Sequence, residues 1–396
     1  MRNPIKKTNP ISRRTFISTA GSLAIAAPAI VRAANEGPER KIGLAIVGLG
    51  GFAHSSIAPE LKSCKNAYLA GVVTGDPNGK GKAWAAEHGF PESSIYTYDT
   101  MHKMADNPNI DFVHIVTPNA LHAEHTIASA KAGKHVMCEK PMATSVADCE
   151  RMIAACKQAG VLLGVNYRLQ WEPNHQKAIE LIAGGSIGDI ACGSYEFSWG
   201  YAGALKGPNK HKIKKWLLDP KMAGGGALYD TGVYGIQAAC YLSGKEPVSV
   251  RGFAAKRHPD LFPDGIEETM TSELMFEDGF QAICRASYSH STHQCTTSGD
   301  KGMIDIRPGT RPNGRFGSVF GQSGRGEPNP KALYHNTKLI KCAQTLQQAV
   351  LLDAFAGAIR SKASTFRTPG EMGLRDIRII EAIYRSAANN GASVII

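Results

Sequence analysis

A glycine-rich turn directly after an apolar run constrains the fold of this chain more than any other feature. Residues 42–47 (Ile-Gly-Leu-Ala-Ile-Val) have the pattern of a buried parallel strand, and residues 48–53 (Gly-Leu-Gly-Gly-Phe-Ala) follow at once, with helical spacing to about Cys64. In such a strand–turn–helix unit the first glycine permits a tight turn, the second lets the backbone approach a pyrophosphate, and the small third residue lets helix and strand pack closely. The N–H groups that open the helix would bind the phosphates. The predicted cofactor contacts are Gly48, Gly50, Gly51, Phe52 and Ala53.

Further apolar runs extend this strand into a sheet. They cover residues 68–73, 110–116, 135–138 and 161–165, with helical patterns between them. Strands that alternate with helices form parallel sheets, and ligands bind at the edge where the carboxyl ends of such strands meet. That edge would combine residues 48–53, 74–76, 117–119 and 139–141. We therefore expect a dinucleotide-binding Rossmann domain over residues 41–166, with Lys140 on its ligand-binding edge.

The end of the second strand bears on the choice of cofactor. Enzymes that use NAD usually place an acidic residue there, against the ribose 2′-hydroxyl. This strand ends in Thr74, with Lys80 and Lys82 just beyond it, and a hydroxyl with ammonium groups suits the 2′-phosphate of NADP. The alternative is that Asp76 binds the ribose and the lysines are merely solvated. NADP is the predicted cofactor, with Thr74 and Lys80 among its contacts.

From about residue 167 the pattern changes. Alternation typical of strands covers residues 190–199, 247–255, 269–276, 279–288 and 301–306, with few helices between them. Strands in succession without crossover helices indicate antiparallel pairing. The predicted fold class is α/β: an N-terminal Rossmann parallel sheet plus a C-terminal α+β domain, residues 167–396, with an open, mostly antiparallel sheet. Helical spacing returns at residues 345–359 and 371–388, and the last helix would pack either within this domain or back on the first.

Two loops stand out in this half. Residues 205–215 contain five lysines and a histidine, which either attract an anionic substrate or form a solvated insertion. Residues 307–330 are rich in Gly, Pro and Arg, which predicts a long surface excursion.

Candidate catalytic residues follow a run of glycines at 224–226. If a helix opens after them, Asp230 and Tyr234 are four residues apart and share one face near its N-terminus. A phenol has a pKa of about 10 and is a weak base at neutral pH, but a nearby ammonium favours the phenolate. With Lys140 as that ammonium, Tyr234 becomes an acid/base group. The plainer alternatives are a packed core tyrosine and a surface lysine at the end of a strand.

The first 33 residues have the features of an export signal. Basic residues precede Ser12-Arg13-Arg14-Thr15-Phe16, an apolar run covers residues 20–31, and Val31-Arg32-Ala33 forms a small-residue cleavage site. The run is too short to span a membrane. The adjacent arginines resemble a twin-arginine signal, which would export the folded protein to the periplasm; an ordinary Sec signal is the alternative. Residues 34–40 would remain as a short arm.

Composition bears on partners and on redox state. The chain has 45 Lys and Arg against 34 Asp and Glu; six of the basic residues and no acidic one lie in the first 33, so the remainder has 39 against 34, a net charge of +5. This balance does not favour nucleic acid as a partner. The nine cysteines are odd in number and include no C-x-x-C pair, so we expect core residues and neither a disulfide framework nor a zinc site. No metal is predicted, because His122 and His125 have helical spacing without a third ligand.

From Lys41 to the C-terminus the chain resembles the Gfo/Idh/MocA oxidoreductase family, and within it the branch of periplasmic glucose–fructose oxidoreductases. The motifs that carry the resemblance are residues 48–53, 117–122 (Thr-Pro-Asn-Ala-Leu-His), 133–141 (Gly-Lys-His-Val-Met-Cys-Glu-Lys-Pro), Tyr167-Arg168, and the glycines 224–226 leading to Asp230 and Tyr234. The resemblance implies a Rossmann domain followed by a domain whose open sheet often forms the interface of a homodimer or homotetramer.

The same resemblance implies roles for individual residues. Lys140 would contact the nicotinamide ribose and the substrate hydroxyl, Tyr234 would be the acid/base, and Asp230 would bind the substrate and the lysine. Further implied cofactor contacts are Pro118, Asn119, His122, Glu139, Lys140 and Arg168, and further implied substrate contacts are Tyr167 and Trp216. In this branch NADP stays tightly bound while an aldose is oxidised at C1 to a lactone and a second sugar is reduced in the same site.

Two other classes of function stay open. Some exported members of the superfamily are glycosidases that oxidise and re-reduce their sugar around a bound NAD. A sugar sensor without catalysis is the third class, and the presence of Lys140, Asp230 and Tyr234 disfavours it.

Overall fold

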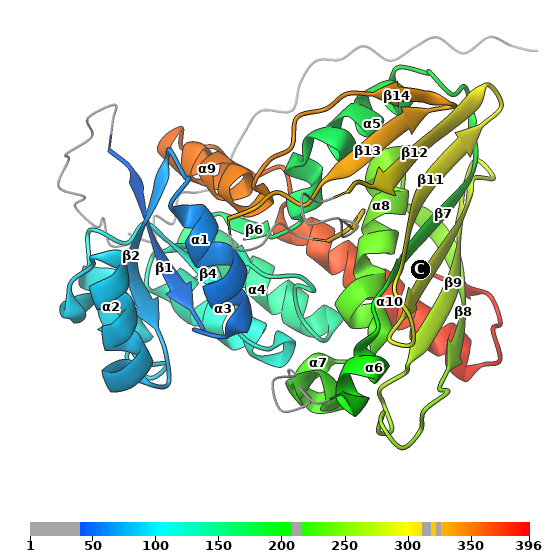
Figure 1. Ribbon diagram of the computed structural model, residues 1–396. Helices are drawn as coiled ribbons and strands as arrows, with labels where there is room; N and C mark the ends of the chain where they lie inside the picture. Colours follow the sequence, from blue (N-terminus) through cyan, green and yellow to red (C-terminus); the bar gives the residue numbers. More distant parts are fainter. Residues whose placement is uncertain (1–39, 208–214, 311–317, 322–325) are drawn as a thin grey trace, which may run out of the picture. The chain divides into compact units, whose positions relative to one another are not determined.

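The computed structural model describes residues 40–207, 215–310, 318–321 and 326–396. The predicted export signal and residues 34–39 of the predicted arm lie outside the described residues, as do residues 208–214 of the lysine-rich loop. Residues 41–396 form one unit, which contains two sheets (Figure 1).

The first sheet has six parallel strands. Their order is β3 (Ile95–Tyr96), β2 (Ala67–Val73), β1 (Ile42–Val47), β4 (Phe112–Ile115), β5 (His135–Cys138) and β6 (Leu163–Val165). Every neighbouring pair is parallel. This is the strand order of a Rossmann fold, so the predicted parallel dinucleotide-binding sheet is confirmed.

Helices cover both faces of this sheet, which explains its nearly continuous apolar strands. Residues of α3 (His122–Lys131) and α4 (Val146–Ala159) share one core cluster with Ala45 and Val47, while α9 (Gln347–Arg360) packs against β1, β2 and α1 (Ala58–Leu61) on the side of Leu44 and Ile46. The buried Glu60 carboxylate on α1 accepts a hydrogen bond from Gln348 N at 2.8 Å. This carboxylate lies at the N-terminus of α9 and accepts from one of the N–H groups that the helix itself leaves unpaired. The bond holds α9, which comes from near the end of the chain, against the first sheet.

The second sheet has nine strands among the described residues. Their order is β14 (Lys338–Ile340), β13 (Lys331–His335), β12 (Gly302–Pro308), β11 (Thr292–Gly299), β7 (Ile190–Ser198), β10 (Gln281–Ser287), β9 (Thr269–Phe276), β8 (Pro247–Ala255) and β15 (Val394–Ile395). The pairs are antiparallel except β7–β10, so the predicted mostly antiparallel sheet is confirmed. The sequence did not predict β11, because its run Thr-His-Gln-Cys-Thr-Thr-Ser-Gly lacks apolar alternation.

Three helices lie on one face of the second sheet: α5 (Pro173–Ala183), α8 (Val233–Ser243) and α10 (Gly370–Ala388) (Figure 1). Helix α10, the last of the chain, also packs against α4 and β6, so it contacts both halves of the unit. The shorter α-helices are α2 (Lys82–His88), α6 (Tyr201–Lys206) and α7 (Pro220–Ala223). The 3₁₀ and π segments are η1 (Ala53–Ile57), η2 (Pro77–Gly81), η3 (Glu92–Ser94), η4 (Met101–Asp106), η5 (Asn119–Leu121), η6 (Arg168–Trp171), η8 (Lys215–Leu218) and η9 (Leu228–Gly232).

Part of the predicted surface excursion over residues 307–330 is buried. Val319 and Phe320 are fully buried, and the Phe320 ring lies 6.3 Å from that of Tyr234. The prediction was wrong for Val319 and Phe320, because a Gly-, Pro- and Arg-rich composition does not reveal where the two apolar side chains within it pack.

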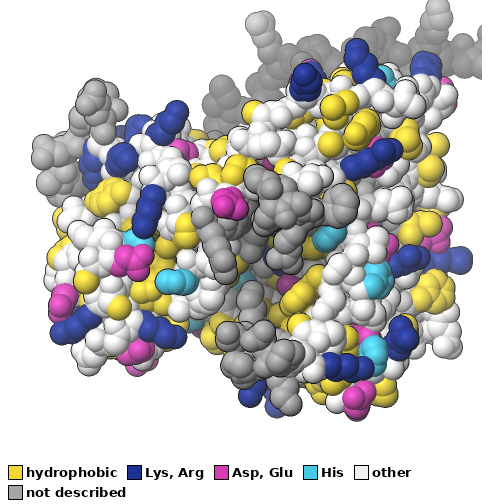
Figure 2. Space-filling model, in the orientation of Figure 1, with side chains coloured by type: hydrophobic (Ala, Val, Ile, Leu, Met, Phe, Trp, Pro, Cys, Tyr) yellow, Lys and Arg dark blue, Asp and Glu magenta, His cyan; other side chains and the backbone are white. Residues whose placement is uncertain are grey.

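The described surface carries mixed charge. On the face shown in Figure 2, the Lys and Arg side chains are interspersed with acidic and hydrophobic ones and form no single continuous patch among the coloured residues. None of the described helices is both long and apolar enough to cross a membrane.

Candidate active site

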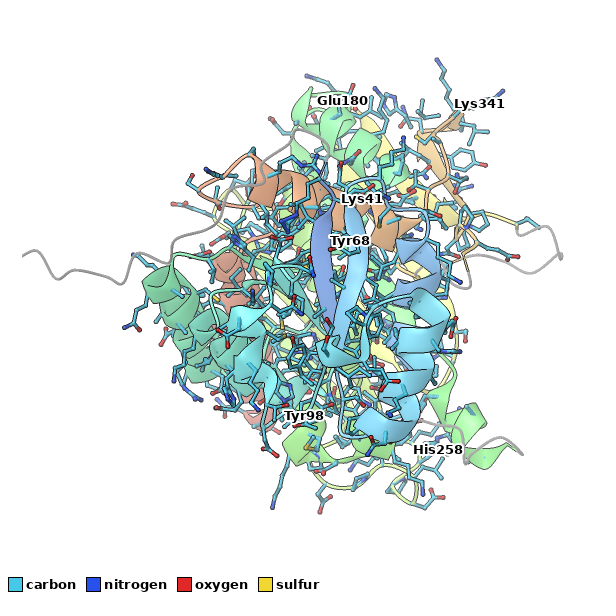
Figure 3. All side chains as sticks on the ribbon, turned by 90° about the vertical axis from the view of Figure 1, so that its left-hand side faces the viewer. Lys41, Tyr68, Tyr98, Glu180, His258 and Lys341 are labelled. Atoms are coloured by element: carbon cyan, nitrogen blue, oxygen red, sulfur yellow. The ribbon has the colours of Figure 1, made fainter. Side chains whose placement is uncertain are left out.

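A cavity of about 750 Å³ opens at the carboxyl edge of the first sheet. Four segments that follow strands line it: residues 48–52, 74–76, 116–119 and 139–141. Figure 3 shows this edge: Lys41 marks the amino end of β1, and Tyr98, which also lines the cavity, lies at the opposite end of the strands. The part of the chain after the first sheet adds these residues to the lining: Arg168, Phe197, Trp199, Trp216, Asp230, Thr231, Tyr234 and Gly321.

The glycine turn leaves room for a ligand beside its backbone. Gly48 has φ +98°, and a Cβ there would lie 2.8 Å from the Thr117 side chain, so only glycine fits. A Cβ on Gly50 or Gly51 would meet no heavy atom within 4 Å, and both residues line the cavity. The predicted contact Ala53 is fully buried and is not part of the lining. Its small side chain serves the packing of the helix, and the open cradle beside Gly50 and Gly51 fits a pyrophosphate.

The residues after β2 divide into two groups. Thr74, Asp76 and Lys80 line the cavity, whereas Lys82 forms an ion pair with Glu92 at 3.1 Å. Both oxygens of the Asp76 carboxylate accept backbone hydrogen bonds, from Gly79 N at 2.9 Å and Lys80 N at 3.1 Å. These bonds lower the pKa of Asp76 and use it as a helix cap. Lys80 is therefore the lysine of the predicted pair that faces the cavity.

Three of the predicted cofactor contacts, His122, Asn119 and Glu139, connect the segments that form the rim of the cavity. His122 places Nδ1 3.0 Å from Pro141 O and Nε2 2.9 Å from Thr117 O. Burial lowers the pKa of His122, and a neutral ring donates through one nitrogen only. Asn119 donates from Nδ2 to Ala223 O at 2.8 Å. Glu139 accepts hydrogen bonds from the buried His114, at 3.2 Å, and from Asn166. All three residues line the cavity, but most of their polar groups bond to other protein groups and hold the segments around the cavity in place.

Lys140, Asp230 and Tyr234 meet in the cavity. The Lys140 ammonium donates to the backbone oxygen of Asp230 at 2.6 Å and lies 3.5 Å from Oδ1 of the same residue. It also lies 4.7 Å from the centroid of the Tyr234 ring. Burial by itself would lower the pKa of Lys140, but Tyr234, Asp230 and Glu139 outweigh burial, so the pKa is raised and the ammonium persists.

The helix that carries Asp230 and Tyr234 begins with the π turn η9. A π turn inserts an extra residue into the helix and is common at functional sites. The preceding glycine segment is held by the buried Glu267, whose carboxylate accepts from Gly226 N at 2.8 Å and Leu228 N at 2.7 Å. A Cβ on Gly226 would lie 2.0 Å from Glu267 O. The glycine is therefore required for the close approach that sets the direction of η9 and α8.

Arg168 makes a contact that sequence reasoning did not predict. Its Nη1 donates to the Tyr234 hydroxyl, and its Nη2 donates to Phe320 O at 2.7 Å. The guanidinium carbon lies 4.9 Å from the centroid of the Tyr234 ring. Two cations, Lys140 and Arg168, thus lie beside one tyrosine, and a hydroxyl that accepts from arginine keeps its own proton for another acceptor.

One predicted substrate contact lies elsewhere. Tyr167 is buried, is not part of the cavity lining, and has its pKa raised by burial and by the carboxylate of Asp376 on α10. Tyr167 has φ −85° and ψ 60°, where the chain turns from β6 into the 3₁₀ segment η6 that begins at Arg168. The two neighbouring side chains therefore leave the backbone in different directions, and only that of Arg168 lines the cavity. Trp216, the other predicted substrate contact, does line the cavity.

Five lining residues had no signal strong enough to single them out: Tyr98, Phe197, Trp199, Thr231 and Gly321. Phe197 and Trp199 lie at the carboxyl end of β7, which the sequence predicted as a strand without indicating its neighbours. No group of three or more His, Cys, Asp or Glu side chains suited to a metal ion occurs in the described part of the chain.

Comparison with known proteins identifies the family. The model of an oxidoreductase family with an NAD-binding Rossmann fold matches residues 42–167, and the model of the GFO/IDH/MocA C-terminal domain matches residues 175–305. The chain belongs to the Gfo/Idh/MocA oxidoreductase family. The predicted family is confirmed, and the chain is an NAD(P)-dependent oxidoreductase.

Individual members of the Gfo/Idh/MocA family show how far the similarity extends. D-xylose 1-dehydrogenase [NADP(+)] from Haloarcula marismortui is 27% identical over 350 residues, which are 88% of this chain and 92% of that protein. The crystal structure of aldose-aldose oxidoreductase from Caulobacter crescentus, complexed with glycerol, is 34% identical, with a TM-score of 0.79, 90% of this chain covered and 100% of that one. An inositol dehydrogenase homolog from Azotobacter vinelandii, complexed with NAD⁺, shares the fold at 20% identity, with a TM-score of 0.74 over 90% of this chain and 98% of that one.

Proposed function

We propose that this protein transfers a hydride between tightly bound NADP and a sugar, oxidising an aldose at C1 to a lactone and reducing a second sugar in the same site. The observation that carries the proposal is the contact of Lys140 with both Asp230 and Tyr234 inside the cavity that the glycine turn opens. The relatives named for D-xylose and for aldoses support a sugar as the substrate class.

Each residue has a proton-handling or orienting task in this reaction. When bound, NADP supplies the hydride acceptor and donor. Tyr234 takes the proton of the C1 hydroxyl in the oxidation and returns a proton to the carbonyl oxygen in the reduction. Lys140 and Arg168 stabilise the negative phenol oxygen, and Asp230 orients a sugar hydroxyl and Lys140.

The preference for NADP is argued from the residues after β2. Thr74 and Lys80 line the cavity, and both carboxylate oxygens of Asp76 are already occupied by backbone N–H groups. A carboxylate used in this way has fewer acceptor sites for a ribose 2′-hydroxyl, while the Lys80 ammonium suits a 2′-phosphate.

A Tyr234→Phe variant tests the catalytic assignment. We expect the purified variant to retain its nucleotide, detected by fluorescence of the reduced form and by release on acid denaturation, and to lose turnover with every aldose of a test panel. Tyr241→Phe is the matched control, because Tyr241 lies on the same helix and its hydroxyl bonds to His175 Nδ1 at 2.8 Å. Full activity of Tyr234→Phe would refute the assignment. Absence of any nucleotide in the wild type would refute tight binding.

We also propose that the face of the second sheet that no described helix covers forms a homodimer or homotetramer interface. Phe253, Ile283 and Leu339 are 56%, 50% and 47% exposed, on strands β8, β10 and β14, and the cross-strand register places them on the face opposite the helices. The exposed Cys192 on β7 lies on the same face. Sedimentation of the wild type and of Ile283→Glu tests the interface: a wild-type monomer, or a variant that assembles unchanged, contradicts it.

Export to the periplasm by the twin-arginine machinery is the third part of the proposal. Arg13 and Arg14 precede an apolar run, and all nine cysteines are free, seven of them buried, as suits a chain that folds in a reducing compartment before export. Changing both arginines to lysine should retain the protein in the cytoplasm on cell fractionation. Unchanged export of that variant would contradict the twin-arginine route.

A further inference from the structure

The second carboxylate oxygen of Asp230 has two donors that lie outside the motifs that carry the family resemblance. Trp199 Nε1 lies 3.2 Å from Oδ2, and the Tyr288 hydroxyl lies 3.3 Å from the same oxygen. Oδ1 is the oxygen that lies 3.5 Å from the Lys140 ammonium. One oxygen is thus held by two neutral donors, and the other is left for the charged partner and the substrate.

Both donors come from the ends of two adjacent parallel strands. Among the described strands of the second sheet, β7 and β10 are the pair that runs parallel, so their carboxyl ends meet at one edge. Trp199 directly follows β7 and Tyr288 directly follows β10. Trp199 N donates to Ser287 O at 2.9 Å, and the two rings meet edge to face with centroids 5.9 Å apart. The strand pairing therefore fixes the two donors side by side.

The surroundings of Tyr288 keep it a donor. The residue is fully buried, stacks on Phe262 at 5.8 Å, and packs against Tyr201 at 4.9 Å. Burial first, and then the negative charge of Asp230, raise the pKa of Tyr288 well above its ordinary value, so its hydroxyl stays protonated. The indole N–H of Trp199 can only donate.

We propose that Trp199 and Tyr288 are positioning residues that hold the Asp230 carboxylate with Oδ1 turned to Lys140 and to the sugar. The inference rests on the proposed function. With Oδ2 saturated, Asp230 accepts a sugar hydroxyl through Oδ1, and a carboxylate that cannot rotate keeps the Lys140 ammonium beside the Tyr234 ring. A loose Asp230 would let both the lysine and the substrate move.

Kinetics of the conservative variants test the proposal. Tyr288→Phe and Trp199→Phe each remove one donor and keep an aromatic ring, and a hydrogen bond to a charged group is strong enough that each should lower kcat/KM for the sugar about tenfold. Affinity for NADP should stay within about twofold. The matched control is Tyr195→Phe, which removes a buried hydroxyl on β7 that bonds to Thr297 Oγ1 at 2.8 Å, and it should leave kcat/KM unchanged.

A second background separates positioning from general damage to the fold. In an Asp230→Ala protein the acceptor of both hydrogen bonds is gone, so adding Tyr288→Phe should change the residual kcat/KM by less than about twofold. An equal loss in both backgrounds, or no loss when Tyr288→Phe is made alone, overturns the proposal.

A readout that needs no turnover completes the test. The chain has four tryptophans, so the protein labelled with ¹⁵N-tryptophan gives few indole N–H resonances, and Trp199→Phe identifies that of Trp199. Asp230→Ala removes the acceptor, so it should move the Trp199 signal and leave those of Trp84 and Trp171 in place; an unmoved Trp199 signal refutes the contact. If the wild type oxidises no sugar but the substitution of Asp230 still moves the Trp199 signal, the proposed function is refuted and the positioning role is retained.

Discussion

Arg168 offers the sharpest test of how the cavity controls its tyrosine. The side chain is 3% exposed and divides its hydrogen bonds between the Tyr234 hydroxyl and the Phe320 carbonyl. Arg168→Met keeps the length of the side chain but removes the charge and both donors. If Tyr234 carries negative charge during the reaction, the lost hydrogen bond to it is worth about 1.5–3 kcal/mol. That corresponds to a loss of roughly ten- to hundredfold in kcat/KM.

The same substitution affects the fold separately. The Phe320 carbonyl would lose its partner in a buried position, which costs about 1–3 kcal/mol of unfolding free energy. Arg168→Lys retains a charge and at least one donor, so it should recover part of kcat/KM. Arg367→Met is the matched control, because Arg367 stacks on Trp171 with 5.4 Å from its guanidinium carbon to the ring centroid and does not line the cavity.

Steady-state kinetics at saturating cofactor, with NADP affinity measured independently, distinguish the two roles of Arg168. A fall in kcat/KM for the sugar at unchanged NADP affinity supports the contact with Tyr234. A variant within about threefold of the wild type refutes the reasoning. A loss confined to NADP affinity would instead support the cofactor contact that the family resemblance implies.

Three further predictions concern Lys80, Lys140 and the cysteines. Lys80→Ala should lower the preference for NADP over NAD by roughly tenfold, measured as the ratio of dissociation constants, whereas Lys82→Ala should leave that ratio unchanged because Lys82 pairs with Glu92. Because the pKa of Lys140 is raised, its ammonium contributes to stability in full below the ordinary lysine value of about 10.4, and the contribution disappears only as pH rises through the higher folded value. The difference in unfolding free energy between wild type and Lys140→Met should therefore be constant from about pH 7 to about pH 10, and a decline within that range contradicts the raised pKa. In the native protein a thiol reagent should modify Cys342 slowly and the seven buried cysteines not at all; Cys192 should react fast in a monomer and slowly in an assembly that covers the second sheet.

The part of the cavity that the first sheet forms could be predicted from the sequence, because the patterns that indicate it involve residues close together in the chain. A strand, a glycine turn and a helix are adjacent in the chain, and alternation of strands with helices forces parallel pairing, so the rim residues had to meet at one edge. The contact of Lys140 with Asp230 and Tyr234 connects the first sheet to η9 and α8. Helical spacing predicted that Asp230 and Tyr234 share one face, the chemistry of a phenol suggested Lys140 as its partner, and the family motifs supported that pairing. Tyr167 shows the limit of such motifs, because at the turn from β6 into η6 a single position separates its side chain in the core from that of Arg168 in the cavity.

By itself, then, the sequence determined the parallel sheet, its glycine turn and the residues at its carboxyl edge. Only the tertiary structure decided that β7 pairs in parallel with β10, that Gly321 lines the cavity, and that Arg168 reaches the hydroxyl of Tyr234. The physical reason is that side-chain periodicity shows which residues face inward, but not which strand is the neighbour or where a loop returns. Trp199 and Tyr288 lie 89 residues apart in the chain, and both can donate to the same oxygen of Asp230 only because the carboxyl ends of β7 and β10 are adjacent.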